Sequence, residues 1–397
     1  MPASLAELHS KTHAELIAGA QAAGVDAAAG MCPDDLIFAL LQHSAQAENQ
    51  IYGRGVLEVH GEGFGFLRSP AANYLPGVDD IYVSQSQIRR FKLETGDTVL
   101  GLVRPPKEGE RYLALLRVER VNGDPPGSEQ PAFDSLTAIY PDDRLPLDTD
   151  PALKVVDFVA PIGLGQRGLL IAPSRTGREE LLRRLVELLS GEDELALTVL
   201  LIEEKPEEIQ EWRSHTRAEV VATTFDEAPA RTLQIADIVF ERARRRVERG
   251  DDVVVIVDSL SRLLRACLAE VPHVGRDLGG VDAAALHRLR RYMGAARALE
   301  EGGSLTVIGV LSGEPSSRSE QALIDDLRDV ANWELTLSRD LADRGVRPAI
   351  DVHRSGNHRP QGLLTPEELE QRAAWRSKLT GDPVEDGAAL IALLAKG

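Results

Sequence analysis

The spacing of apolar residues changes along the chain and divides it into three folded regions and a linker. Through residues 1–50, Leu, Ile and Ala recur at three- and four-residue intervals, which predicts a small N-terminal helical bundle. Over residues 51–122 the apolar period falls to two, in short runs divided by Gly, Pro and Asp. This pattern predicts a small closed β-barrel of the oligonucleotide-binding class. Residues 123–150 are rich in Pro, Asp and Ser, which is typical of a linker.

Strand-like and helical stretches alternate through residues 151–397. The strand-like stretches are continuously apolar and stand at 167–172, 195–202, 252–260 and 304–311, with helical patterns between them, for example at 227–249 and 282–300. Continuous apolar strands are buried on both faces, so this region predicts an α/β domain with a mainly parallel sheet.

The composition is that of an ordinary globular protein, with 43% hydrophobic and 27% charged residues. No apolar run approaches the length of a membrane span, and the first residues lack the apolar centre of a signal peptide. The two cysteines, Cys32 and Cys267, lie far apart and form no metal-ligand pattern. We therefore expect a cytoplasmic protein without a membrane partner.

The formal net charge of −18 argues against a nucleic-acid partner, but the charge is unevenly spread. Residues 51–122 hold ten Lys/Arg against nine Asp/Glu, so this region carries +1 and the remainder −19. The local sign of charge decides whether phosphates are attracted. The net charge of the whole chain therefore does not exclude binding of nucleic acid to the barrel region.

An aromatic pattern lies within the barrel region. Phe64 and Phe66 stand two residues apart in "GFGF", so on a strand they point to one face, and Arg68 continues that face. Tyr82 and Tyr112 lie on other predicted strands that could adjoin it. Exposed rings beside a cation can stack bases, whereas aromatic residues in strands more often fill a core. The pattern alone leaves both interpretations open.

The stretch "LLIAPSRTGREELLRRL", residues 169–185, has the order strand, small-residue turn and helix. A phosphate-binding P-loop has this order, with A/G-x-x-x-x-G-K-[ST] at the turn. The chain keeps that spacing through Ala172, Pro173, Ser174, Arg175, Thr176 and Gly177, and then has Arg178 and Glu179 in place of lysine and a hydroxyl residue. The stretch is thus a nucleotide site, the remains of one, or an ordinary turn.

Several segments closely resemble one known family. "GVLEVHGEGFGFLRSP", "DDIYVSQSQIRRF", "TGDTV" and "RPPKEGERYLALLRV" are similar to the cold-shock-like RNA-binding domain of the bacterial transcription termination factor Rho family. Similar segments precede it ("ASLAELHSKTHAELI") and follow it ("PIGLGQRGLLIAP", "RAEVVATTFDE", "GGVDAAALHR", "GAARALEEGGSLT"). The resemblance implies a barrel that holds pyrimidine-rich single-stranded RNA. It assigns the contacts to Phe64, Phe66, Arg68, Asp80, Tyr82, Glu110, Arg111 and Tyr112.

The same resemblance implies a RecA-like core that closes into hexameric rings, with ATP between subunits and RNA through the centre. Asp258 ends the run "VVVIV", where a Walker-B carboxylate would hold Mg²⁺, although a helix cap could also stand there. Glu204 matches the family's water-activating glutamate, and Arg354 matches the arginine that reaches a neighbour's site. Ring-lining RNA contacts would fall on Arg276, Gly279, Gly280 and Arg318.

The departures from the family pattern gather around the nucleotide. Arg178 keeps the charge of the P-loop lysine but has a larger planar group. Glu179 replaces the Mg²⁺-binding hydroxyl and would repel a phosphate, unless this carboxylate itself binds Mg²⁺. Arg347 stands where the family has an adenine-stacking phenylalanine. The remaining changes are Gly345 for an arginine, Glu203 for an aspartate and Lys205 for an arginine.

Two functional hypotheses follow from the resemblance. The first is a Rho-type termination factor that hydrolyses ATP to move along nascent RNA and release RNA polymerase. The second is a catalytically silent Rho paralogue that binds RNA, or joins or competes with an intact Rho. We expect a homohexameric ring, or a mixed ring with an intact Rho. ATP and Mg²⁺ are the implied cofactors, with weak or absent ATP binding at the altered turn.

Overall fold

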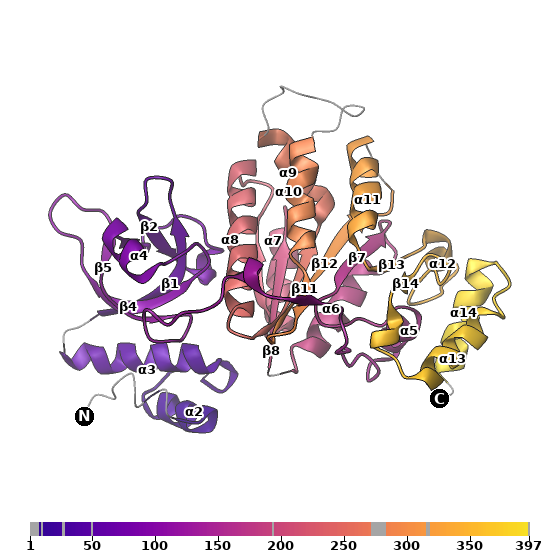
Figure 1. Cartoon of the computed structure of the whole chain (residues 1–397), viewed down its shortest axis with the longest axis horizontal. Coiled ribbons are helices and arrows are strands. Elements are labelled where there is room, and N and C mark those ends of the chain that lie inside the picture. Colours follow the sequence, from indigo (N-terminus) through magenta and orange to yellow (C-terminus); the bar gives the residue numbers. More distant parts are fainter. Residues whose placement is uncertain are drawn as a thin grey trace. The chain divides into compact units, whose positions relative to one another are not determined.

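The computed structural model describes residues 8, 11–25, 28–48, 51–192, 194–270, 283–314 and 318–395, drawn in Figure 1. They form two compact units. The first comprises Met1–Gln130 with Asp237–Arg245, and the second comprises Pro131–Ala236 with Arg246–Gly397. Within the described residues, no helix combines the length and the apolar character that a membrane span requires.

The first unit begins with two packed helices, α2 (His13–Ala22) and α3 (Pro33–Glu48). Thr12 caps α2: its hydroxyl accepts the Glu15 N–H, and the Glu15 carboxylate accepts the Thr12 N–H. Leu16 of α2 and Leu36 of α3 are buried in one apolar cluster. The predicted N-terminal helices are therefore present, and their apolar cluster also includes Leu100 of the strand that spans Thr98–Arg104.

The barrel follows in the same unit. The described strands close in the order β1-β2-β3-β5-β4, with β3 and β5 parallel and the other neighbours antiparallel. Their bounds are β1 Ile51–Val59, β2 Gly65–Arg68, β3 Ile81–Val83, β4 Thr98–Arg104 and β5 Leu113–Val121, and helix α4 spans Gln85–Phe91. At Gly101, where the β4–β5 register shifts, a Cβ would lie 2.1 Å from the Arg117 carbonyl oxygen. Only glycine fits at this bulge.

The second unit contains a nine-stranded sheet in its described part. Its main order is β14-β13-β7-β12-β10-β8-β9, and every pair in that order is parallel except β13–β14. The bounds are β6 Ala138–Ile139, β7 Arg167–Ala172, β8 Leu195–Leu201, β9 Glu219–Ala222, β10 Asp252–Asp258, β11 Arg297–Leu299, β12 Ser304–Ser312, β13 Trp333–Thr336 and β14 Gly356–Asn357. The closed barrel and this mainly parallel sheet confirm the predicted fold class.

Helices cover the sheet, as Figure 1 shows for this unit. Alternate strand residues such as Leu170, Val199 and Ile256 share a buried core with Leu182 of α6 and Trp212 of α7. Helix α9 packs on β12, and α11 packs on β7. The bounds are α5 Pro151–Val159, α6 Arg178–Leu189, α7 Pro206–His215, α8 Pro229–Val247, α9 Leu260–Glu270, α10 Ala283–Gly294, α11 Arg318–Val330, α12 Arg339–Asp343, α13 Pro366–Arg376 and α14 Pro383–Leu394.

Candidate nucleic-acid interface and nucleotide site

Four aromatic rings form a continuous group on the barrel. Phe66 of β2 lies opposite Tyr82 of β3, with ring centroids 6.0 Å apart, and 4.9 Å from Tyr112, just before β5. Phe64 lies 5.9 Å from both Phe66 and Tyr82. All four rings are at least partly exposed, and none belongs to the buried barrel core. We call these four residues the aromatic platform.

Arg68 lies beneath the aromatic platform and is not an exposed cation beside it. Its side chain is 4% exposed, and its guanidinium carbon is 5.0 Å from the Phe66 ring centroid. It donates to the Glu58 carboxylate at 2.7 Å and to the buried Asp80 carboxylate, which also accepts the Gly77 N–H at 2.8 Å. Arg68 and Asp80, both expected as RNA contacts, are buried here: Arg68 lies against the Phe66 ring, and Asp80 holds Arg68 in place.

The segment before β5 brings further charge to this side of the barrel. Both oxygens of Glu110 accept hydrogen bonds from Arg104, and one also accepts the Lys107 N–H at 3.0 Å. These bonds lower the pKa of the Glu110 carboxyl to about 2. The exposed Arg111 guanidinium lies 5.5 Å from the Tyr112 ring centroid. The structure thus adds Arg104, which the sequence pattern did not single out, as the residue that holds Glu110.

His60 is a second residue that the sequence reasoning missed. Its ring stacks on Phe64 at 5.3 Å between centroids with an interplanar angle of 14°, and it meets the edge of Phe66 at 5.6 Å. The signal was present in the hairpin register: β1 pairs with β2 so that Val59 faces Gly65, which places His60 opposite Phe64. A tight turn at "GEG" would have indicated this register.

The altered P-loop stretch has the predicted order of strand, turn and helix. Strand β7 ends at Ala172 and α6 begins at Arg178. Two residues of the turn, Arg175 and Gly177, have positive φ of 61° and 84°. The buried Thr176 hydroxyl donates to the Pro173 carbonyl at 2.7 Å, and Arg339 donates to both oxygens of Ser174. The loop is a well-bonded turn at a helix N-terminus, the usual place for a phosphate.

Arg178 lies between its substituted neighbour Glu179 and a carboxylate of the site, Asp258. Nη2 of Arg178 lies 3.1 Å from Oε1 of Glu179 and 3.5 Å from Oδ2 of Asp258. Asp258, at the end of β10, is 2% exposed, and its Oδ1 has no hydrogen-bond partner among the described residues. Burial raises the pKa of the Asp258 carboxyl, and the Arg178 and Arg262 guanidinium groups oppose that rise.

This arrangement departs from the usual magnesium site of a P-loop protein. Mg²⁺ takes oxygen ligands in near-octahedral geometry, usually with a carboxylate and the P-loop hydroxyl among them. Here a carboxylate replaces the hydroxyl, and the Arg178 guanidinium lies 3.5 Å from Oδ2 of Asp258, where a metal ion would compete with it.

Glu204, the expected water-activating residue, is held by an ion pair. Its Oε2 accepts from Nη1 of Arg262 at 2.6 Å, and the same nitrogen donates to the carbonyls of Ile202 at 2.9 Å and Glu203 at 3.2 Å. Glu203 has a positive φ of 48°. The carboxylate thus lies at the end of β8, near Asp258, but it already has a strong partner.

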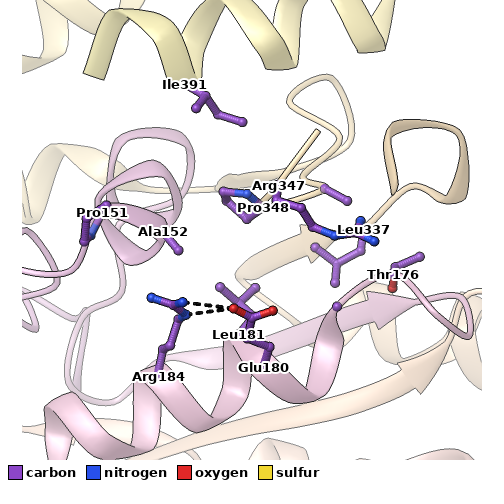
Figure 2. Close-up of a pocket in the computed structure, with 12 residues that line it drawn as sticks. Pro151, Ala152, Thr176, Glu180, Leu181, Arg184, Leu337, Arg347, Pro348 and Ile391 are labelled. Atoms are coloured by element: carbon purple, nitrogen blue, oxygen red, sulfur yellow. Dashed lines mark hydrogen bonds and ion pairs between the residues drawn. The ribbon is translucent and has the colours of Figure 1, made fainter. Parts of the chain in front are cut away.

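A cavity of about 240 Å³ opens beside the turn (Figure 2). It is smaller than the roughly 300–1,000 Å³ of a typical ligand pocket, so it suits part of a nucleotide, such as the base. Figure 2 shows the paired Glu180 and Arg184 on α6 on one side and Arg347 on another. Arg347 lies near Gly177, because a Cβ there would be 3.9 Å from its side chain. A flexible cation therefore lines the cavity where a stacking ring was expected.

The remaining predicted residues are dispersed. Arg354 has a side chain 72% exposed, with Nε 3.9 Å from the Asp351 carboxylate. Arg318 is the first residue of α11. Arg276, Gly279 and Gly280 lie outside the described residues. The site as described therefore consists of the turn, Glu204, Asp258 and the cavity.

Comparison with known proteins separates the barrel from the α/β domain in the same way. Residues 53–127 match the family described as "Rho termination factor, RNA-binding domain", and residues 152–356 match "ATP synthase alpha/beta family, nucleotide-binding domain". Transcription termination factor Rho of Pseudomonas aeruginosa is 43% identical over 403 residues, covering 99% of this chain and 96% of that protein. Rho of Escherichia coli strain K12 is 45% identical over 378 residues, covering 93% of this chain and 90% of that protein.

Solved structures extend the likeness of the fold. An ATPase from the type III secretion system of pathogenic bacteria superposes with a TM-score of 0.53 at 21% identity, covering 65% of this chain and 79% of that one. At this identity the likeness shows a shared fold and says nothing about activity.

Proposed function

The chain belongs to the family of transcription termination factor Rho, and from this membership we propose that it binds single-stranded, pyrimidine-rich RNA on its barrel while turning over ATP slowly or not at all. The observation that carries the RNA part is the aromatic platform of Phe64, Phe66, Tyr82 and Tyr112, exposed on a closed barrel that matches the family's RNA-binding domain. Bases stack on such rings without a duplex partner.

Charge supports the same assignment. The barrel region carries +1 in a chain of −18, so phosphates meet less repulsion there than elsewhere. Beneath the rings, Arg68 is bound by Glu58 and Asp80, which keeps Phe66 in place before RNA arrives. Preorganised rings lose little conformational freedom on binding.

The RNA part is tested by removing two rings. Each base–aromatic stack contributes about 1–3 kcal/mol. Loss of two stacks in Phe64→Ala with Phe66→Ala should therefore weaken binding of a labelled oligocytidylate by about thirtyfold or more, measured by fluorescence anisotropy. Phe225→Ala, which truncates a phenylalanine 61% exposed in the second unit, is the matched control. Unchanged affinity in the double variant would contradict the proposal.

Low ATP turnover is supported by the contacts at the turn. Arg178 pairs with Asp258, Glu179 replaces the hydroxyl, and Arg347 replaces a stacking ring. Each change removes or occupies a group that would hold the triphosphate, the metal or the base. The direct test is phosphate release by the full chain with Mg²⁺, ATP and oligocytidylate. Rapid RNA-stimulated release would show that Arg178 performs the role of the lysine.

We further propose a ring-like assembly in the cytoplasm, acting on RNA polymerase, either of this chain alone or mixed with an intact Rho. The exposed Arg354 supports an assembly, because its guanidinium reaches only Asp351 among the described residues, at 3.9 Å. Sedimentation at micromolar concentration, with and without RNA, tests it. A monomer under every condition would exclude a ring of this chain alone.

The silent paralogue is the second candidate, and the Arg178–Asp258 pair favours it. In that role the chain binds RNA or enters the rings of an intact Rho without hydrolysis of its own. Adding the purified chain to an intact Rho should then lower RNA-stimulated ATP hydrolysis in proportion to the amount added. The Phe64→Ala, Phe66→Ala variant separates competition for RNA from mixing of subunits, since only competition requires the aromatic platform.

A further inference from the structure

His60 extends the aromatic platform by a ring of a different chemical kind. The hairpin between β1 and β2 holds it in place, because the His60 N–H donates to the Phe64 carbonyl at 2.8 Å and its carbonyl accepts the Gly63 N–H at 2.8 Å. The imidazole stacks on Phe64, touches the edge of Phe66 and remains 37% exposed. A base stacked on these two phenylalanines would therefore lie next to an imidazole.

The charged groups that face this imidazole come from two strands. Its Nε2 lies 3.8 Å from the Glu58 carboxylate of β1 and 3.4 Å from Nη2 of Arg68 of β2. Arg68 is itself paired with Glu58 and Asp80. A neutral imidazole can accept from Arg68 at Nε2, whereas an imidazolium lies at ion-pair distance from Glu58 and meets the like charge of Arg68. The Glu58 carboxylate therefore favours a charged ring and the Arg68 guanidinium opposes it.

We propose that His60 is an RNA-contacting residue whose protonation strengthens RNA binding, so that affinity rises as the pH falls from 8 to 6. This inference rests on the proposed RNA-binding function of the barrel. The phosphates of bound RNA add negative charge beside the ring, and a neighbouring anion favours the charged form of a histidine. An imidazolium can donate to a phosphate and attract the face of a base. Histidine is the side chain that ordinarily changes charge between pH 5 and 8.

The experiment measures binding of labelled oligouridylate to the full chain at pH 8 and pH 6 and constant ionic strength. Uridine is chosen because its base does not take up a proton in this range. Uptake of up to one proton changes affinity by at most about tenfold per pH unit, and we expect at least about threefold tighter binding at pH 6. His60→Phe, which keeps a ring but no proton site, should bind like the unmodified chain at pH 8 and should show no tighter binding at pH 6.

His60→Leu removes the ring and should bind more weakly at both pH values. His43→Phe, at an exposed histidine of α3, is the matched control and should keep the full pH dependence. Proton uptake is also measured on the unmodified chain, from binding enthalpies in two buffers of different ionisation heat. Net uptake should be a fraction of one proton in the unmodified chain and close to zero in His60→Phe.

Three results would overturn the inference: equal pH dependence in His60→Phe and the unmodified chain, unaltered affinity in His60→Leu, or no proton uptake by the unmodified chain. They are separable from failure of the proposed function. If binding occurs and depends on Phe64 and Phe66 but not on His60, only this inference is wrong. If the unmodified chain binds no oligouridylate or oligocytidylate, the RNA-binding proposal itself is wrong.

Discussion

Restoring the P-loop residues should restore nucleotide binding by a predictable amount. The perturbation is Arg178→Lys with Glu179→Thr, which releases Asp258 from its 3.5 Å ion pair and removes the carboxylate from the first turn of α6. Two like charges 4 Å apart interact by about 4 kcal/mol at an effective dielectric of 20. The Glu179 side chain is 57% exposed, so solvent screens much of this repulsion. We expect a net gain of about 1–2 kcal/mol, or about 5–30-fold in affinity.

The assay is displacement of a fluorescent ATP analogue, with Mg²⁺ and with a chelator. In the reverted chain binding should become stronger with Mg²⁺, because Asp258 and a hydroxyl are then available as ligands. Adding Arg347→Phe should improve binding further by about 0.5–1.5 kcal/mol through stacking of the base. Arg344→Phe, at an exposed arginine of the same segment outside the cavity lining, is the matched control. The reasoning is refuted if the unmodified chain already binds ATP as tightly as the reverted one.

Three further predictions concern the barrel. Asp80→Asn removes one partner of the buried Arg68 pair and should destabilise the barrel by about 3–5 kcal/mol, measured by urea unfolding. Hydrogen bonds from Arg104 lower the pKa of the Glu110 carboxyl to about 2. The Glu110–Arg104 pair should therefore persist from neutral pH down past pH 4 and be lost as the pH falls through 2. The midpoint of the Glu110 carboxyl titration, measured by NMR, checks this. Gly101→Ala should disrupt the bulge and cost at least about 1–3 kcal/mol, seen as a lower Tm.

Periodicity predicted the architecture because the barrel and the sheet bury their residues in simple repeats. Continuous apolar strands led to the parallel sheet, and alternation led to the barrel. The spacing of the turn at 172–177 likewise predicted a strand, a loop and a helix. Local patterns of this kind are encoded within a few neighbouring residues.

The contacts that decide the chemistry were not predictable in the same way. Arg178 meets Asp258 across 80 positions of sequence, and no spacing rule connects them. Arg68 was expected as an exposed cation, but two carboxylates bury it. His60 joins the rings only through the hairpin register. Side-chain pairing between distant strands depends on three-dimensional packing, which a linear pattern does not contain.

The ion pair between Glu204 and Arg262 changes how a preserved residue should be interpreted. Arg262 also bonds two backbone carbonyls, and losing its partly buried carboxylate partner would leave a guanidinium without its counter-ion. Mutation at Glu204 would therefore be selected against for folding alone, even in a lineage that had given up ATP turnover. An intact glutamate at this position therefore serves the fold whether or not ATP is hydrolysed, so its presence alone does not establish turnover in this chain.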